Sequence, residues 1–133
     1  AKTTPLHPIK ERELPVHPGV QLRKLLQTIS MPQARLAELM RMQPSQLNEV
    51  LNARRPLNMS IAMLLEAIFD IPANVWIRMQ NDYDEYFFLH DQVSQEKYAY
   101  AREHARNEMG KYVDAVRNLE LFQAIKHDPE ERK

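Results

Sequence analysis

Apolar residues recur every three or four positions along most of the chain, which is the spacing of amphipathic helices. Alternating apolar and polar runs, the pattern of strands, are nearly absent, and the only glycines are Gly19 and Gly110. The pattern therefore predicts an all-α protein. The expected helices cover residues 19–29, 32–40, 44–51, 59–69 and 72–87, followed by two more within 93–125 that are separated at Gly110.

Residues that favour helix ends mark most of these boundaries. Pro32, Pro44 and Pro72 suit the first helical turn, where a missing N–H costs nothing. Ser30 is expected to end the first helix, and Asn58 or Ser60 to cap the fourth. In the fifth helix an aromatic band around Trp76 favours core packing over a ligand site, although it could also serve a dimer interface.

Four segments follow from this reading. Residues 1–17 carry several prolines without periodicity and predict an extended or disordered arm. Residues 18–90 form the expected helix-turn-helix domain, residues 91–126 a C-terminal helical extension, and residues 127–133 a frayed tail. The extension could lengthen a dimer, wrap a partner or cover the fifth helix, and no motif selects among these roles.

Charge and composition narrow the function classes. The formal net charge is zero, yet residues 18–58 hold six basic and two acidic residues, and residues 59–92 hold one basic and six acidic residues. This separation suggests two faces with different partners. Cysteine is absent, no apolar run is long enough to cross a membrane, and no signal peptide is apparent. We therefore expect a cytoplasmic protein with no membrane partner.

The segment 35–56 suggests a DNA-binding corner. Two short helices joined by three or four residues, the second followed by Arg54 and Arg55, are typical of a helix-turn-helix, whose second helix lies in the major groove. In the second helix Leu47, Val50 and Leu51 share one face, which leaves the polar residues on the others.

Four stretches resemble the HigA-like antitoxins, a branch of the Xre-type helix-turn-helix proteins. They are HPGVQLRKLL (17–26), PQARLAELM (32–40), QLNEVLNARRPLN (46–58) and IPANVWIRMQNDYDEY (71–86), in the order and spacing of that family. The resemblance spans roughly half of the chain. It implies a five-helix, lambda-repressor-like core and a dimeric antitoxin that binds and silences a co-encoded RNA-cleaving toxin and represses its own operon.

The resemblance also implies roles for individual residues toward operator DNA. Ser45, Gln46 and Asn48 would face bases, which suits them chemically because Gln and Asn can read adenine through a paired donor and acceptor. Arg54 and Arg55 would contact phosphate, and Gln33 could donate to a phosphate at a helix start.

Four positions depart from the family pattern. Arg41 occupies a turn position that is commonly Gly, so a side chain must tolerate that backbone conformation. Gln43 replaces the usual Ser cap, and Pro44 follows it. Glu49 would repel a phosphate, but it could accept from a cytosine amino group or point at solvent. Gln43 and Glu49 complete the set of candidate DNA-contacting residues.

An enzyme is not predicted. The pattern favours a solvated face over a pair of catalytic acids for Asp82, Asp84 and Glu85. The histidines lack the spacing of metal ligands. We expect no catalytic residue, metal, cofactor or small-molecule substrate. The competing interpretation is a helical protein-interaction module that has lost DNA recognition.

Overall fold

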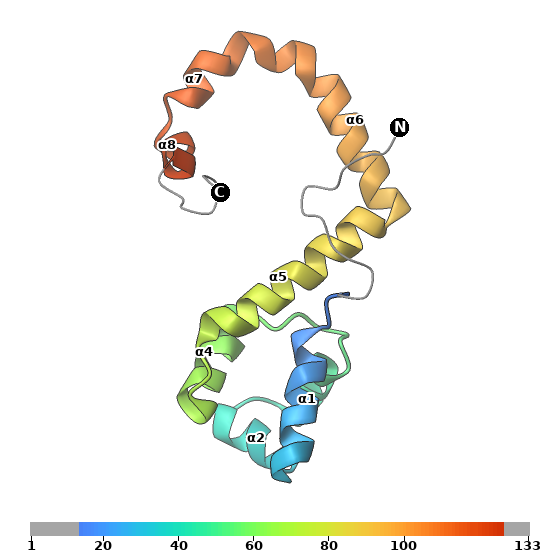
Figure 1. Ribbon diagram of the computed structural model, residues 1–133, viewed down its shortest axis with the longest axis vertical. Helices are drawn as coiled ribbons and strands as arrows, with labels where there is room; N and C mark the ends of the chain where they lie inside the picture. Colours follow the sequence, from blue (N-terminus) through green and yellow to red (C-terminus); the bar gives the residue numbers. More distant parts are fainter. Residues whose placement is uncertain (1–13, 127–133) are drawn as a thin grey trace. The chain divides into compact units, whose positions relative to one another are not determined.

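The structure, a computed structural model, describes residues 14–126. The predicted tail (127–133) and all but the end of the predicted arm (1–17) lie outside this range. Every regular element among residues 14–126 is a helix, so the all-α prediction is confirmed (Figure 1). No helix in this part of the chain is both long enough and apolar enough to cross a bilayer. The chain divides into two units between His90 and Asp91.

The first unit contains five helices close to their expected bounds. They are α1 (Pro18–Ile29), α2 (Gln33–Met40), α3 (Pro44–Leu51), α4 (Met59–Phe69) and α5 (Ala73–His90). Pro44 occupies the first turn of α3 and Asn58 caps α4 by accepting from the Ile61 N–H, as expected.

Two helices begin one residue later than expected. Pro32 is the N-cap of α2, in extended conformation, and is not its first helical residue. Pro72 likewise precedes α5, which begins at Ala73. The Ala73 N–H donates to the Glu66 carboxylate at 2.7 Å, so a side chain of α4 satisfies the first N–H of this helix.

One core holds these five helices together. Leu22, Leu36, Leu47, Leu51 and Leu65 are fully buried in it. Trp76 is only 3% exposed, which confirms its predicted packing role. Gln80 is also buried and accepts from the Leu57 N–H at 2.8 Å, so it ties α5 to the segment after α3. Each of the five helices therefore contributes buried side chains to one core, although the end of α5 leaves Phe87 51% exposed.

Gly19 allows α1 to cross α3 closely. A Cβ atom built on Gly19 would overlap the carbonyl oxygen of Val50, a backbone atom that cannot rotate away. Gly19 itself is buried and lies in the first turn of α1. The glycine is thus required by close approach and fixes the position of α3 against the rest of the core.

His17 forms the N-cap of α1, at the end of the segment predicted as an arm. Its Nδ1 accepts from the Gly19 N–H at 2.9 Å, its ring lies edge-on to Tyr83 at 4.9 Å, and it also hydrogen-bonds to the backbone of Arg55. The side chain is 4% exposed. Burial lowers the pKa of His17, against a smaller opposing effect of the Asp84 charge.

Stability should therefore fall in mildly acidic solution. In the unfolded chain His17 titrates near 6.5, whereas the folded protein favours the neutral ring, so the unfolded state binds more protons below that pH. We expect the free energy of unfolding, measured by urea denaturation, to decline as pH falls from 6.5 toward the lower folded pKa. The His17→Asn variant, which retains a capping side chain, should show a flatter profile. An unchanged slope in this variant would contradict the assignment.

The second unit begins with α6 (Gln92–Met109), which Asp91 caps by accepting from the Ser94 N–H. It continues through η2 (Gly110–Tyr112), α7 (Val113–Arg117) and α8 (Glu120–Lys126). The expected interruption at Gly110 is present. The expectation of one helix beyond it is wrong, because a turn at Asn118 separates α7 from α8. The Leu119 carbonyl then accepts from the N–H groups of Phe122 and Gln123 in the first turn of α8.

Candidate nucleic-acid interface

The turn between α2 and α3 places a non-glycine residue, Arg41, in the left-handed conformation. Arg41 has φ 53° and ψ 42°, the left-handed region that glycine occupies most easily. The N–H groups of Arg41 and Met42 donate to Glu38 and Ala37, which closes the end of α2. Gln43 then caps α3 without a side-chain hydrogen bond, as its poor capping chemistry predicted.

Helix α3 separates its apolar side from its polar side. Leu47, Val50 and Leu51 are fully buried. Gln43, Ser45, Gln46 and Asn48 are exposed, and Glu49 is half-buried. The polar side of the helix therefore lies open to solvent while its apolar side fixes the helix in the core.

A hydrogen-bonded row of side chains crosses this surface from α2 to α1. The Asn48 amide donates to Gln33 at 3.4 Å and its oxygen accepts from the Asn52 amide at 2.9 Å. Arg23 of α1 donates to the Asn52 side chain and, at 2.9 Å, to the Leu51 carbonyl. The structure thus brings together Gln33 and Asn48, and adds Arg23 and Asn52, which the sequence analysis did not select.

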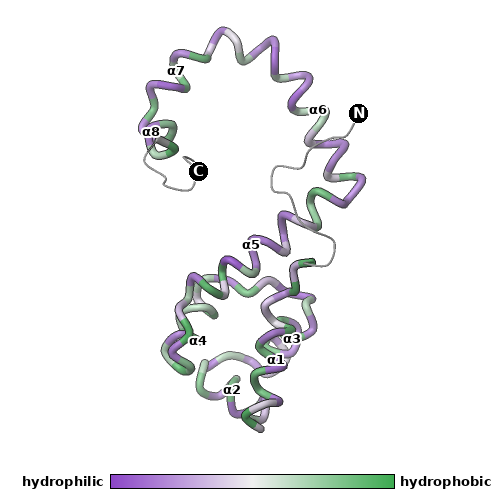
Figure 2. The backbone as a smooth tube through the Cα atoms, viewed as in Figure 1, coloured by the Kyte–Doolittle hydropathy of each residue, from purple (hydrophilic) through white to green (hydrophobic). Residues whose placement is uncertain are grey.

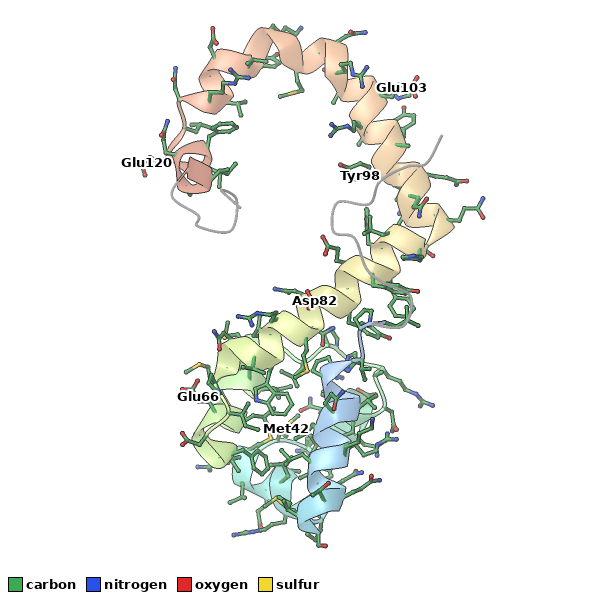
Figure 3. The ribbon with its side chains drawn as sticks, in the orientation of Figure 1. Met42, Glu66, Asp82, Tyr98, Glu103 and Glu120 are labelled. Carbon is green, nitrogen blue, oxygen red and sulfur yellow. The ribbon has the colours of Figure 1, made fainter. Side chains whose placement is uncertain are left out.

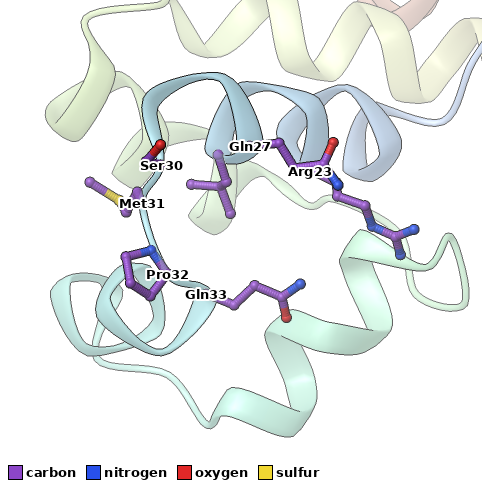
Figure 4. Close-up of a pocket in the computed structure, with 7 residues that line it drawn as sticks. Arg23, Gln27, Ser30, Met31, Pro32 and Gln33 are labelled. Carbon is purple, nitrogen blue, oxygen red and sulfur yellow. The ribbon is translucent and has the colours of Figure 1, made fainter.

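A groove is lined by the two end residues of this row, Arg23 and Gln33. It has a volume of about 350 Å³ and lies between α1 and the start of α2, with Arg23 and Gln33 on opposite sides (Figure 4). Its other lining residues are Leu26, Gln27, Ser30, Met31 and Pro32. The groove is open, so both polar side chains are accessible from solvent.

The two candidate arginines differ in their surroundings. Arg55 donates through Nε and Nη2 to one carboxylate oxygen of Glu49, at 2.9 and 2.7 Å. Arg54 is exposed and forms no ion pair within the part of the chain that the structure describes. On sequence grounds, Glu49 could accept from a base or point at solvent. In the structure it forms an ion pair with Arg55, which the sequence analysis did not consider. This contact holds the arginine but offsets its charge.

Acidic groups outside this surface form no metal site among residues 14–126. Asp82 is exposed, and Asp84 accepts from the Gln80 amide at 2.9 Å.

Comparisons with known proteins place this arrangement in a family. No family model matches the chain. It is 32% identical over 79 residues to virulence-associated protein I of Dichelobacter nodosus, a match that covers 58% of this chain and 73% of that protein. The antitoxin HigA of Pseudomonas aeruginosa, solved with the higBA promoter, is 25% identical with a TM-score of 0.58 and covers 63% of this chain and 92% of its own. The chain belongs to the HigA-like antitoxin family.

Two further structures share the fold. An antidote protein of a plasmid maintenance system from Nostoc punctiforme is 25% identical, with a TM-score of 0.57 over 66% of this chain and 94% of its own. A Pseudomonas aeruginosa protein in complex with its operator DNA is 28% identical, with a TM-score of 0.50 over 53% and 76%. Membership of the HigA-like family agrees with the prediction that this chain is not an enzyme. In all four comparisons at least a third of this chain has no counterpart.

Proposed function

We propose that this chain is a cytoplasmic, homodimeric antitoxin that binds operator DNA, represses its own operon and neutralises an RNA-cleaving toxin by direct binding. The observation that carries the DNA-binding part is the open polar side of α3, held rigidly by its buried apolar side. The related HigA solved with the higBA promoter, and the related protein solved with its operator, support the same assignment.

Base reading is assigned to Ser45, Gln46 and Asn48. The Asn48 amide retains one donor and one acceptor position beyond its bonds to Gln33 and Asn52, which is what bidentate reading of adenine requires. Because two neighbours already orient it, little side-chain entropy is lost on binding. The Gln46 side chain is exposed, forms no hydrogen bond among the described residues and supplies an adaptable second reader.

Phosphate contacts are assigned to side chains around the readers. Arg54 is exposed directly after α3, and Arg23 and Gln33 lie at the two ends of the hydrogen-bonded row. Arg55, bound to Glu49, is the weaker phosphate ligand. Such contacts fix the protein on the duplex without reading sequence.

The toxin-binding part has a different support, the end of α5. The Tyr83 and Phe87 rings pack there at a tilt, with their centroids 4.5 Å apart, and Phe87 is half-exposed. Asp82 and Asp84 lie on either side of this aromatic strip along the helix. No Lys or Arg occurs between residues 79 and 96. An enzyme that cleaves RNA needs a basic face for its substrate, and an acidic, aromatic surface is complementary to such a face.

DNA binding is tested by fluorescence anisotropy of the full chain with a duplex from upstream of its own gene and with a shuffled duplex. We expect tighter binding to the upstream duplex, with affinity that falls as salt rises. The Arg54→Ala variant should weaken binding to both duplexes and reduce the salt slope by about one. Equal, weak binding to both duplexes would instead favour a protein-interaction module that has lost DNA recognition.

The Glu49→Gln variant should bind DNA more tightly. The change removes a negative charge beside the expected phosphates and frees Arg55 to reach one, so the salt slope should steepen by about one. The same change at Glu120, in the second unit, serves as the matched control and should leave affinity unchanged. Weaker binding of Glu49→Gln to the upstream duplex alone would show that Glu49 itself reads a base.

A further inference from the structure

The helices of the second unit have no core. No side chain is buried in α6, η2 or α7, and every described side chain among residues 91–125 is exposed or half-exposed. The exposed residues include large apolar ones, such as Tyr100 (64%), Leu119 (54%) and Leu121 (80%). Hydrophobic positions recur among hydrophilic ones throughout these helices (Figure 2). Helices in water normally depend on packing of an apolar face, so this unit lacks the contact that stabilises it.

Part of this apolar surface forms one continuous line, here called the seam. It consists of Tyr98, Ala101, Ala105, Met109, Tyr112 and Val116, which are spaced three or four residues apart and so share one side of the helices. In Figure 3, Tyr98 lies on the inner side of the curve that this unit makes, whereas Glu103 and Glu120 point outward. The apolar seam and the charged side chains of Glu103 and Glu120 therefore lie on different sides of these helices.

The charges beside the seam favour a second copy of the chain over a strongly charged partner. Residues 91–126 hold six acidic and six basic residues, interleaved along the sequence, so the unit has no net charge for a basic or an acidic partner to recognise. A surface carrying both signs can be complementary to itself across a two-fold axis. The acidic end of α5 is different in this respect, because it lacks Lys and Arg.

The sequence of α6 fits an antiparallel pair. With Ala101 opposite Ala105 of the second copy, two small side chains meet at the crossing and let the helices approach closely. Lys97 and Glu108 lie along the same edge of the seam, three turns apart, so this pairing brings Lys97 of each copy close to Glu108 of the other. We propose that the seam of the C-terminal extension is the surface through which two copies of this chain associate.

The test is sedimentation velocity of the full chain over a range of concentrations without DNA. We expect a monomer–dimer equilibrium that Ala105→Glu weakens by roughly tenfold or more, since it places an unpaired charge in the contact. The Ala99→Glu variant makes the same change on the opposite side of α6 and should leave the dimer intact. Lys97→Glu and Glu108→Lys should each weaken it, and the double variant should restore it.

Several outcomes would overturn the inference. A wild-type chain that stays monomeric, a dimer that survives Ala105→Glu, or equal losses in Ala105→Glu and Ala99→Glu would each do so. Circular dichroism of each variant separates loss of contact from loss of helix, and the Lys97/Glu108 exchange remains decisive if Ala105→Glu fails to fold. The inference locates the dimer of the proposed function, but the measurement is independent of DNA. A seam-dependent dimer without operator binding would leave it standing and refute the repressor role.

Discussion

Replacing Gly19 with alanine is expected to destabilise the protein by about 3 kcal/mol, which corresponds to a fall in melting temperature of roughly 12–24 °C. The added methyl group would overlap the Val50 carbonyl oxygen. Because that oxygen is backbone, the clash is relieved only by moving α1 away from α3. The same change disturbs the amide that His17 uses to cap α1. Thermal denaturation followed by circular dichroism measures the effect.

Gly110→Ala is the matched control for this prediction. A Cβ atom on Gly110 meets nothing within 4 Å, and the residue already has right-handed helical angles, φ −54° and ψ −38°. Alanine there should stabilise the chain by about 0.5–1 kcal/mol, because it restricts the unfolded state and favours helix. If Gly19→Ala melts at the same temperature as the wild-type chain, α1 and α3 are not in the close contact described.

Replacing Gln46 with alanine is expected to weaken binding to the upstream duplex by about 1–3 kcal/mol, or roughly 5- to 150-fold. Binding to a shuffled duplex should hardly change, because Gln46 is assigned to bases and not to phosphates. Stability should also be unaffected, since the side chain is exposed and forms no hydrogen bond within the described residues. Anisotropy titrations with both duplexes at one salt concentration give the comparison.

Gln95→Ala makes the same change on α6 and should bind both duplexes as the wild-type chain does. A loss shared equally between the two duplexes would move Gln46 from base reading to backbone contact. Combining Gln33→Ala with Asn48→Ala gives a further check, because side chains joined by a hydrogen bond should lose less together than the sum of their separate losses.

Local signals in the sequence were sufficient for most of the first unit. First-turn Pro44, the Asn58 cap and the 3.6-residue apolar period depend on neighbours within one or two turns, and each appears in the structure as expected. The resemblance to a family with glycine at this position also indicated that Arg41 must accept an unusual backbone conformation, and its φ is 53°. Pro32 and Pro72 were placed one residue too far inside their helices, since a cap and a first-turn position look alike in sequence.

Contacts between distant residues could not be predicted in the same way. Arg23 meets Asn52 across 29 positions, and nothing near either residue indicates the other. The Glu49–Arg55 pair depends on the path of the chain just after α3. Gly19 stood out in the sequence as one of two glycines. That no larger residue fits there depends on the Val50 backbone passing close to it, which the local sequence does not indicate. The break at Asn118 lies in a unit without a core, where packing does not select one continuous helix.

The most direct test of the central claim is nuclear magnetic resonance of the full chain, following side-chain amide signals as the upstream duplex is added. If the polar side of α3 meets the bases, the amides of Gln46, Asn48 and Gln33 should shift strongly, and that of Gln95 should not. Shifts confined to the second unit, with the α3 amides unmoved at saturation, would contradict the account.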